Sequence, residues 1–519
     1  MQTAAYWGAA FRIEETDLDY LNNLLLEDET PLTTDEMTLA IIRRRCEREA
    51  EAAKHRRQGA VVYLPKETYT VGQTLVFPEL QFATGAVVNL RPGRNPEHGE
   101  FDVIAVNLGH GAPREFATRL PGHKLNEATS HAGVESQSPD VIFAEHGRSL
   151  AEKLEARLRA GADVVRIAGR WFPRALLATV NVGHLNLAEA VLDMAGGGPL
   201  PTESLLREVG LPDNINPRLQ AFSLDFALQE DPRFDEVGPA GQVLWYLRRL
   251  EPPEVIFPPR RLESAAPEYD ASKLTPALKT LEQEIEDELS TAASEVPAVD
   301  EATVIVTFPH RRVGTLPLSP RLAQLFPTAH EAPRIRFALV DGDSGEQFPG
   351  WVVRLGRYVF GLDEWYKRRD FPVGGQLVVR RGEQPGEVVV KALTRRPARE
   401  WVRTAVAGAD GRLNFSMQKR LISVSYDELT VIAVDNPVAI DDVWLKNQHV
   451  PFKRLVADLF RELAKLNPQS AVHAKSLYAA VNVVRRSPPS PIFAELVSRP
   501  WYVHVGDAYW RFDQSLWTE

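Results

Sequence analysis

Two kinds of hydrophobic spacing alternate along the chain and divide it into modules. Near the N-terminus, Leu21, Leu24 and Leu25 recur at helical spacing, and residues 1–58 are expected to form a helical segment. From residue 59 the apolar runs become short and alternate with Gly- and Pro-containing turns. This pattern predicts a small β barrel or sandwich over residues 59–126.

Helical spacing returns in the next region, residues 148–250. Gly196-Gly197-Gly198-Pro199 ends one apolar helical stripe, and Thr202 is a plausible N-cap for the next helix. A third stripe is followed by two short strands. Three helices followed by two strands is the element order of a winged helix, so this region is expected to contain one.

Residues 251–300 are rich in Pro and in acidic side chains, and are expected to be a linker with one helix. Leu278, Leu281 and Ile285 would lie along one side of that helix. Two interpretations stay open, a coiled-coil or docking helix and a surface helix of the parent domain.

The remaining chain is expected to form a β domain and a second helical module. Residues 301–405 carry several β-rich runs, and residues 446–519 show three apolar helical stripes followed by a hairpin. Residues 406–445 are expected to form a segment that connects these two modules. The C-terminal module is expected to fold alone. The predicted fold class is therefore multidomain α+β, with two winged-helix modules and two small β-barrel-like domains.

A short pattern recurs at the start of both predicted hairpins. The two copies share identical offsets and are Pro232, Phe234, Val237 and Gly238, and Pro500, Tyr502, Val505 and Gly506. Each copy follows three predicted helices and precedes a strand that contains Trp. We interpret this as a duplicated module, although the pattern alone also recurs by chance in hairpins.

The C-terminal copy resembles the HARE-HTH winged-helix family, whose modules occur in bacterial RNA polymerase delta subunits, restriction proteins and chromatin-associated proteins. The resemblance is carried by the helix phrase from His473 to Val481, by Arg485-Arg486 and Phe493, and by the strand phrase from Tyr502 to Trp510. It implies a winged helix that docks on DNA or on a protein.

The copy within residues 185–250 resembles the same family more loosely. It departs in its three consecutive glycines and in a third helix with Asp225, Glu230 and Asp231. Because acidic side chains repel phosphate, this copy is expected to favour a protein partner.

Residues 302–405 show a weaker similarity to the DNA-binding pseudobarrel, a fold of plant transcription factors and restriction-enzyme effector domains. The pattern consists of Gly314 to Leu318, Arg334 to Val340, Trp351 to Arg354, the helix phrase Gly361 to Tyr366 and the strand start Val373 to Val379. A plain β barrel is the alternative.

Charge is distributed unevenly although the whole chain carries −10. Acidic residues dominate segments 1–50 and 252–300, whereas basic residues dominate 301–405 and 451–511. Nucleic-acid binding depends on local potential, so the two basic modules are candidates. The single cysteine excludes a disulfide framework. The sequence shows neither a signal peptide nor a long apolar run, which predicts a cytoplasmic protein with no membrane partner.

Enzymatic motifs are absent from the sequence. It lacks a phosphate-binding loop, an H-E-x-x-H zinc helix, a G-x-S-x-G elbow and an acidic residue followed two positions later by Lys. His98, His110 and His123 have irregular spacing and predict no metal site. No catalytic residue and no cofactor are therefore expected.

Basic residues near predicted turns and helices are the candidate DNA contacts. Trp365-Tyr366 would let aromatic rings pack on sugars or bases beside the cations. The alternative is that such cations only protect barrel edges. The predicted contacts are Arg311, Arg312, Arg354, Arg357, Lys367, Arg368, Arg369, Lys475, Arg485 and Arg486.

These observations together predict a non-catalytic protein that binds double-stranded DNA in transcription regulation or genome defence. The first alternative is a protein-binding scaffold or an RNA polymerase accessory factor that acts through the winged-helix modules. The second is an enzyme with an unrecognised site in residues 59–126.

Overall fold

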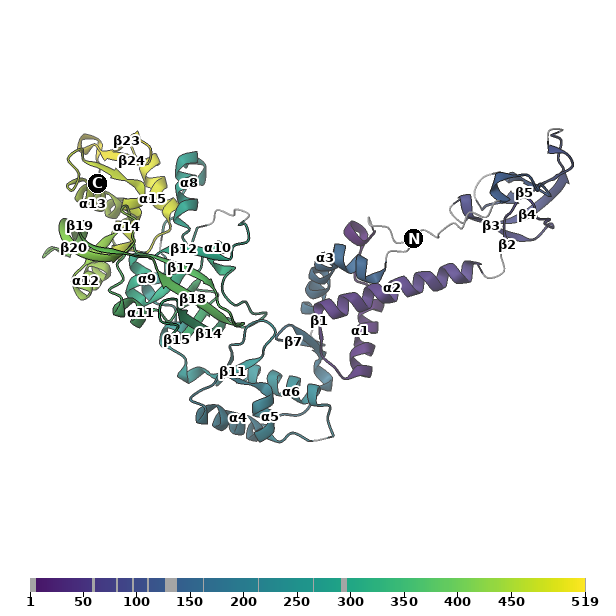
Figure 1. The fold of residues 1–519 in the computed structure, drawn as a ribbon, viewed down its shortest axis with the longest axis horizontal. Coiled ribbons are helices and arrows are strands. Elements are labelled where there is room, and N and C mark those ends of the chain that lie inside the picture. Colours follow the sequence, from purple (N-terminus) through teal and green to yellow (C-terminus); the bar gives the residue numbers. More distant parts are fainter. Residues whose placement is uncertain are drawn as a thin grey trace. The chain divides into compact units, whose positions relative to one another are not determined.

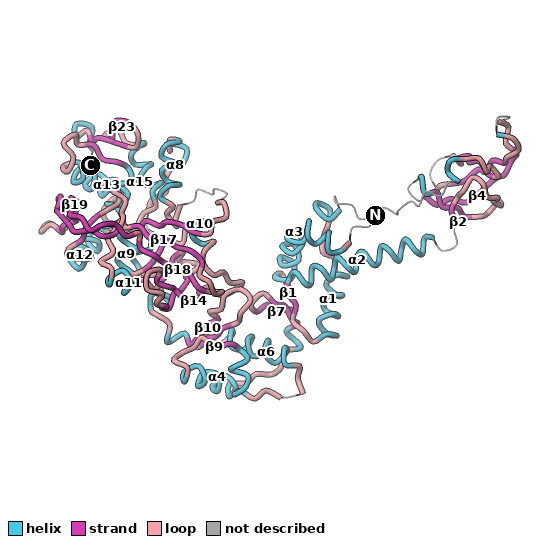
Figure 2. The backbone as a smooth tube through the Cα atoms, in the orientation of Figure 1, coloured by secondary structure: helices cyan, strands magenta, loops and turns pink. Residues whose placement is uncertain are grey.

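A computed structural model describes the whole chain except residues 1–5, 58–60, 81–82, 96–97, 110–111, 127–137, 162, 213, 265, 291–295 and 519. The chain forms two compact units, residues 1–166 with 170–177 and residues 167–169 with 178–519. Figures 1 and 2 show the helices and strands of both units. Helices and several separate sheets occur in both units, so the expected multidomain α and β composition is confirmed.

The first unit contains a helical module whose elements are far apart in sequence. Its elements are the short π-helix η1 (Tyr6–Ala10), α1 (Glu15–Asp28), β1 (Leu32–Thr33), α2 (Thr34–Arg57), α3 (Pro139–Arg159), β7 (Val164–Ile167), β8 (Arg170–Pro173) and η5 (Arg174–Leu176). The strands lie in the order β1-β8-β7. Ser138 caps α3 and Pro139 occupies its first turn, which fixes the helix start.

Helix α3 packs along α2 and belongs to this first unit. The expected 148–250 region is therefore wrong as a single domain, because the unit boundary falls between residues 177 and 178. Sequence spacing detected the second half of α3 but not its partner, which lies about eighty residues earlier in the chain.

A β module is inserted between α2 and α3. It comprises β2 (Val61–Val62), β3 (Thr74–Phe77), η2 (Pro78–Leu80), β4 (Ala83–Pro92), β5 (Asp102–Asn107), β6 (Arg114–Thr118) and η4 (Lys124–Asn126). The five strands pair in sequence order, and Tyr63, Phe77 and Ile104 contribute to the core on one face. The expected β domain over 59–126 is thus a single five-stranded sheet among the described residues.

The second unit begins with a small helical module. Its elements are α4 (Val182–Met194), β9 (Leu200–Pro201), α5 (Thr202–Val209), α6 (Pro217–Glu230), β10 (Phe234–Glu236), β11 (Leu244–Leu247) and η6 (Arg248–Leu250). Asp225 lies in its core and accepts hydrogen bonds from Thr202 Oγ1 at 2.5 Å and Trp245 Nε1 at 2.8 Å. Burial raises the pKa of Asp225 to about 7, so this residue does not make an acidic outer surface as expected.

A seven-stranded sheet follows, with strand order β12-β17-β18-β14-β15-β16-β13. Only β14 and β18 pair in parallel within it. Its elements are β12 (Glu301–Ile305), α9 (Phe308–Val313), β13 (Thr315–Pro317), α10 (Pro320–Ala323), β14 (Arg334–Asp341), β15 (Gln347–Val353), β16 (Tyr358–Phe360), α11 (Asp363–Arg368), β17 (Gln376–Arg381) and β18 (Glu387–Ala392).

Residues 406–445 are not a simple connection. They contain the end of β19 (Thr394–Ala407), all of β20 (Leu413–Val424), β21 (Ile432–Val434) and most of α12 (Pro437–Asn447). Strands β19 and β20 form a long antiparallel hairpin, and β21 pairs in parallel with β19.

The C-terminal module shares one core with neighbouring segments. Its elements are α13 (Phe452–Ala464), β22 (Ala471–His473), α14 (Ala474–Val484), α15 (Pro489–Ser498), β23 (Tyr502–Gly506), β24 (Tyr509–Phe512) and η9 (Gln514–Leu516). The core also takes in Leu278, Phe415 and Ile432, so the module has no separate hydrophobic interior.

The segment expected as an acidic linker is largely packed against its neighbours. It forms α7 (Pro253–Ile256), η7 (Arg260–Leu262), η8 (Ala271–Lys273) and α8 (Pro276–Ile285). Leu278 and Leu281 bury one side of α8 in the C-terminal core, and α8 contacts α15. Because α8 and the C-terminal core belong to the same compact unit, both a docked helix and a surface helix of the parent domain describe this packing.

One element order occurs three times: helix, strand, helix, helix, strand, strand. We name these segments repeat A (residues 15–57 with 139–173), repeat B (182–247) and repeat C (452–512). In each repeat the first strand pairs with the third, which also pairs with the second. The sequence indicated only repeats B and C, because the β module interrupts repeat A.

Candidate nucleic-acid interface

The predicted contact Arg486 is buried, with 2% of its side chain exposed. Its guanidinium binds Asp287 Oδ2 at 2.8 Å, Asp287 Oδ1 at 2.5 Å and Glu288 Oε1 at 2.8 Å. Burial alone would raise the pKa of Glu288, but Arg486 and His310 hold it well below its ordinary value. Arg486 is therefore an interior ion-pair partner and is not placed to contact phosphate.

The other two predicted contacts in repeat C are also buried. Lys475 Nζ lies 2.8 Å from Asp427 Oδ2, and Arg485 donates to the carbonyl oxygens of Asn447 and Val450. The prediction that Lys475, Arg485 and Arg486 face DNA is wrong, because the surrounding segments cover α14 completely. Helical spacing does not distinguish a covered helix from a surface helix.

The cluster Lys367, Arg368 and Arg369 lies among carboxylates. Lys367 pairs with Asp363 and Glu364, Arg368 with Glu346, and Arg369 with Asp341 and Asp343, at 2.6 to 3.1 Å. Five carboxylates around three cations leave no positive local potential for phosphate. Moreover, Trp365 and Tyr366 are core residues, so they do not stack on bases as expected.

The four remaining predicted contacts are held mainly by backbone groups. Arg311 Nε donates to Phe371 O at 2.6 Å, Arg354 to Ala332 O at 2.9 Å and Arg357 to Glu288 O at 3.0 Å. Arg312 instead pairs with Asp441 at 2.6 Å.

Three predicted contacts do come together at one cavity of about 580 Å³. Arg311, Arg312 and Lys367 line it together with Arg420. Asp363, Asp370 and Asp435 also line it, which nearly balances the charge.

The hairpin of β19 and β20 (Figure 1) carries a basic cluster, and none of its cations is among the ten predicted contacts. Residues 394–424 contain seven basic and two acidic side chains. Three of the cations are ion-paired, namely Arg395 with Glu400, Arg412 with Asp410 and Arg420 with Asp435. Arg396, Arg399 and Lys419 are exposed, and no carboxylate within the described residues pairs with them.

Strand alternation places the unpaired cations and exposed apolar groups together. Trp401 lies opposite Lys419, and Arg399 lies opposite Leu421, so all four share one face of the hairpin. Trp401 is 61% exposed and Leu421 is 66% exposed. Lys419 Nζ lies 5.3 Å from the centroid of the Trp401 ring. We name Arg399, Trp401, Lys419 and Leu421, together with the exposed Arg396 in the irregular stretch 395–397 just before them, the hairpin face.

The opposite side of the hairpin packs against the protein, which leaves the hairpin face exposed. Val402 and Ile422 alternate with the exposed residues and pack on Val431. At the hairpin turn, Asn447 Nδ2 donates to Gly411 O at 3.2 Å. The alternation of Arg399, Trp401 and Arg403 with Val402 was a signal for this arrangement. It was missed because the strand lies across the expected domain boundary at residue 405.

A cavity of about 460 Å³ lies beside Trp401 and between the hairpin and repeat C. Arg403, His473 and Tyr509 line it. His473 Nδ1 accepts a hydrogen bond from the Lys475 amide at 3.1 Å, and the rings of His473 and Tyr509 meet edge to face. Burial lowers the pKa of His473, with Lys475 and Arg403 adding to the effect, so this side chain is neutral near pH 7.

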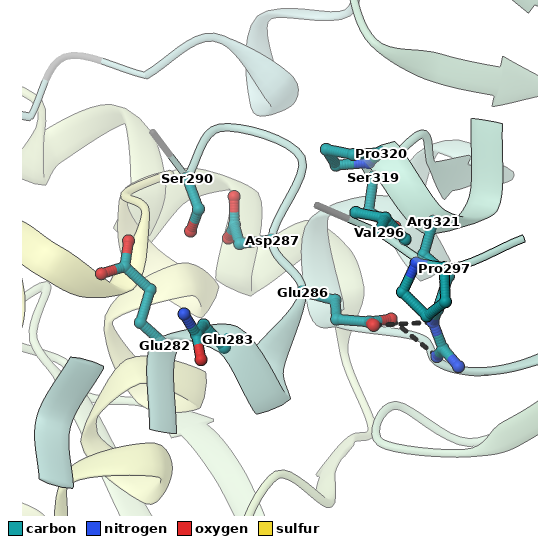
Figure 3. Close-up of a pocket in the computed structure, with 10 residues that line it drawn as sticks. All are labelled: Glu282, Gln283, Glu286, Asp287, Ser290, Val296, Pro297, Ser319, Pro320 and Arg321. Carbon is teal, nitrogen blue, oxygen red and sulfur yellow. Dashed lines mark hydrogen bonds and ion pairs between the residues drawn. The ribbon is translucent and has the colours of Figure 1, made fainter. Parts of the chain in front are cut away.

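A different cavity of about 200 Å³ has acidic walls (Figure 3). Glu282, Asp287 and Ser290 lie on one side, while Glu286 reaches Arg321 on the other at 2.6 Å. Its carboxylates disfavour phosphate. Among the described residues no group of three His, Cys, Asp or Glu side chains could hold a metal ion; the candidate His110 lies outside them.

No family model, no curated protein and no solved structure matches this chain. The described residues contain no helix with the length and apolar character needed to cross a membrane.

Proposed function

We propose that this protein is a non-catalytic DNA-binding protein whose contact surface is the hairpin face. The observation that carries this proposal is the exposed Trp401 with Arg396, Arg399 and Lys419, which have no carboxylate partner in the described chain. Unpaired cations bind phosphate by releasing counterions, and an exposed aromatic ring can stack on a base. None of the ten residues expected from the sequence combines these features.

We further propose that repeats A, B and C are winged-helix modules, since they share the element order and strand order of that fold. In repeat C the third helix, α15, is mostly buried and contacts α8. A winged helix whose third helix is covered cannot insert that helix into a DNA groove. Repeat C therefore acts as a support for the hairpin face.

The scaffold alternative has one observation in its favour. Repeat C shows that a module of this kind can dock on a helix of the same chain, as α15 does on α8. Repeats A and B would then bind helices of other proteins in the same manner.

The test compares full-length protein with two triple variants in fluorescence anisotropy titrations of a labelled 20-nucleotide DNA, single-stranded and duplex, at low salt. We expect Arg396→Ala/Arg399→Ala/Lys419→Ala to weaken binding by about tenfold or more, because phosphate contacts are lost. The matched control, Lys367→Ala/Arg368→Ala/Arg369→Ala, removes the same charge and should change affinity little. Equal loss in both variants, or no DNA binding by the parent protein, would favour the scaffold.

A further inference from the structure

The cavity beside Trp401 has the size and the lining of a site for a planar ring. Its volume of about 460 Å³ lies within the range of small-molecule sites, roughly 300–1,000 Å³. Trp401, Tyr426 and Tyr509 line it together with apolar side chains such as Leu463 and Leu466. Trp401 belongs both to this cavity and to the hairpin face, so the two surfaces are continuous.

Polar groups in the cavity can orient such a ring. His473 is neutral and accepts at Nδ1, which leaves its proton on Nε2 as a donor. No hydrogen bond from Nε2 to another described residue occurs. Arg403 donates to the Glu428 carbonyl and has no ion-pair partner among the described side chains. Both groups can donate to the carbonyl or ring-nitrogen acceptors of a nucleobase.

The covered side of the hairpin argues against duplex DNA as the ligand of this cavity. A two-stranded ribbon reads duplex DNA by entering the major groove. Here β21 pairs with β19, Val402 and Ile422 are buried, and the turn is held by Asn447. A hairpin packed on three sides cannot enter a groove, whereas a single strand can lie across its open face.

We propose that the cavity beside Trp401 takes one unstacked base of single-stranded DNA, while Arg399 and Lys419 contact the neighbouring phosphates. This inference rests on the proposed DNA-binding function and narrows it to a strand with at least one unpaired base. The base stacks on Trp401, and Arg403 and His473 donate hydrogen bonds to its edge.

The experiment measures the affinity of the full-length protein for a labelled dT20 strand and for its dT20·dA20 duplex in the same buffer. We expect tighter binding to dT20. Trp401→Ala should weaken dT20 binding about tenfold, as expected for the loss of one base-stacking contact. Trp401→Phe, which keeps an aromatic ring, should retain most of the wild-type affinity for dT20. The control Val406→Ala removes an exposed apolar side chain of the same strand β19, outside both the hairpin face and the cavity, and should have little effect.

A second variant tests the cavity itself. His473→Asn keeps a side-chain acceptor for the Lys475 amide but removes the Nε2 donor, and should weaken dT20 binding about fivefold. Unchanged dT20 affinity in both Trp401→Ala and His473→Asn would overturn the base site. If Arg396→Ala/Arg399→Ala/Lys419→Ala still weakened binding, the proposed function would stand without it. No affinity for either DNA would overturn both.

Discussion

Arg486 lies among Asp287, Glu288 and the Tyr478 hydroxyl, which donates to Asp287 Oδ2 at 2.6 Å. The two carboxylates come from the segment after α8 and Arg486 from the end of α14, so the network joins regions about two hundred residues apart. A charge in the protein interior is tolerated only when it is paired and hydrogen-bonded.

Replacing Arg486 with Ala should therefore destabilise the protein strongly. The change leaves Asp287 and Glu288 buried without their cation, at a cost of about 3–5 kcal/mol. Thermal unfolding measured by circular dichroism should show a lower midpoint. Arg368→Ala, which breaks an exposed ion pair, serves as the control and should leave the midpoint nearly unchanged. Equal midpoints for the two variants would contradict the assignment of Arg486 to the interior.

His473 makes the stability of the folded protein depend on pH in the mildly acidic range. Burial lowers its pKa below the ordinary 6.5, with contributions from Lys475 and Arg403 that Asp427 and Asp507 oppose. The unfolded chain therefore binds more protons than the folded chain as pH falls below about 6.5. The contribution of His473 to stability is complete above that pH and is lost as pH falls toward the lowered pKa.

The variant His473→Asn isolates this effect, because Asn keeps the helix cap but does not titrate. The wild-type protein should lose more thermal stability between pH 7 and pH 5 than the variant loses. Parallel pH profiles of the two proteins would show that His473 is not responsible.

Among the secondary-structure elements, those with strong local signals were predictable from sequence. The stripes of α13, α14 and α15 and the turn at Gly506-Asp507 were correctly placed, because helical spacing and turn residues act over a few positions. The hairpin β19–β20 was not recognised as one element. Its register depends on packing against Val431 and α12, and neither contact is visible in local spacing.

The sequence also gives no sign of which helices are covered by other segments of the chain. Leu278 and Leu281 were expected to mark one side of a helix, and they do, but what that side contacts depends on the tertiary fold. The same limitation explains why Lys475, Arg485 and Arg486 were assigned to a surface. A basic residue on a helix looks the same in sequence whether its partner is water, phosphate or a buried carboxylate.

The shared core yields a prediction for an isolated fragment. Residues 446–519 were expected to fold alone, yet α14 and α15 bury their apolar sides partly against Leu278, Phe415 and Ile432. The fragment should bind the dye ANS and show weak near-ultraviolet circular dichroism, because these apolar surfaces become exposed. A cooperative unfolding transition without dye binding would restore the original expectation.

For the molecule as a whole, the most informative feature is that one element order occurs three times among the described residues, in repeats A, B and C. Repeat A is not apparent from the sequence because residues 58–138 separate its second and third helices. The order of helices and strands in repeat C was predicted from its spacing, but that spacing gives no sign that other segments cover the third helix. We therefore propose the DNA surface on the hairpin that joins the seven-stranded sheet to repeat C, and not on the repeats themselves.

The salt dependence of DNA binding tests the central claim that the hairpin face supplies the phosphate contacts. For single-stranded DNA, each lost phosphate contact lowers the slope of log affinity against log salt by about 0.7. The account predicts that Arg396→Ala/Arg399→Ala/Lys419→Ala binds dT20 with a slope shallower by about two units, while Lys367→Ala/Arg368→Ala/Arg369→Ala keeps the wild-type slope. An unchanged slope in the hairpin variant, together with a shallower slope in the 367–369 variant, would contradict it.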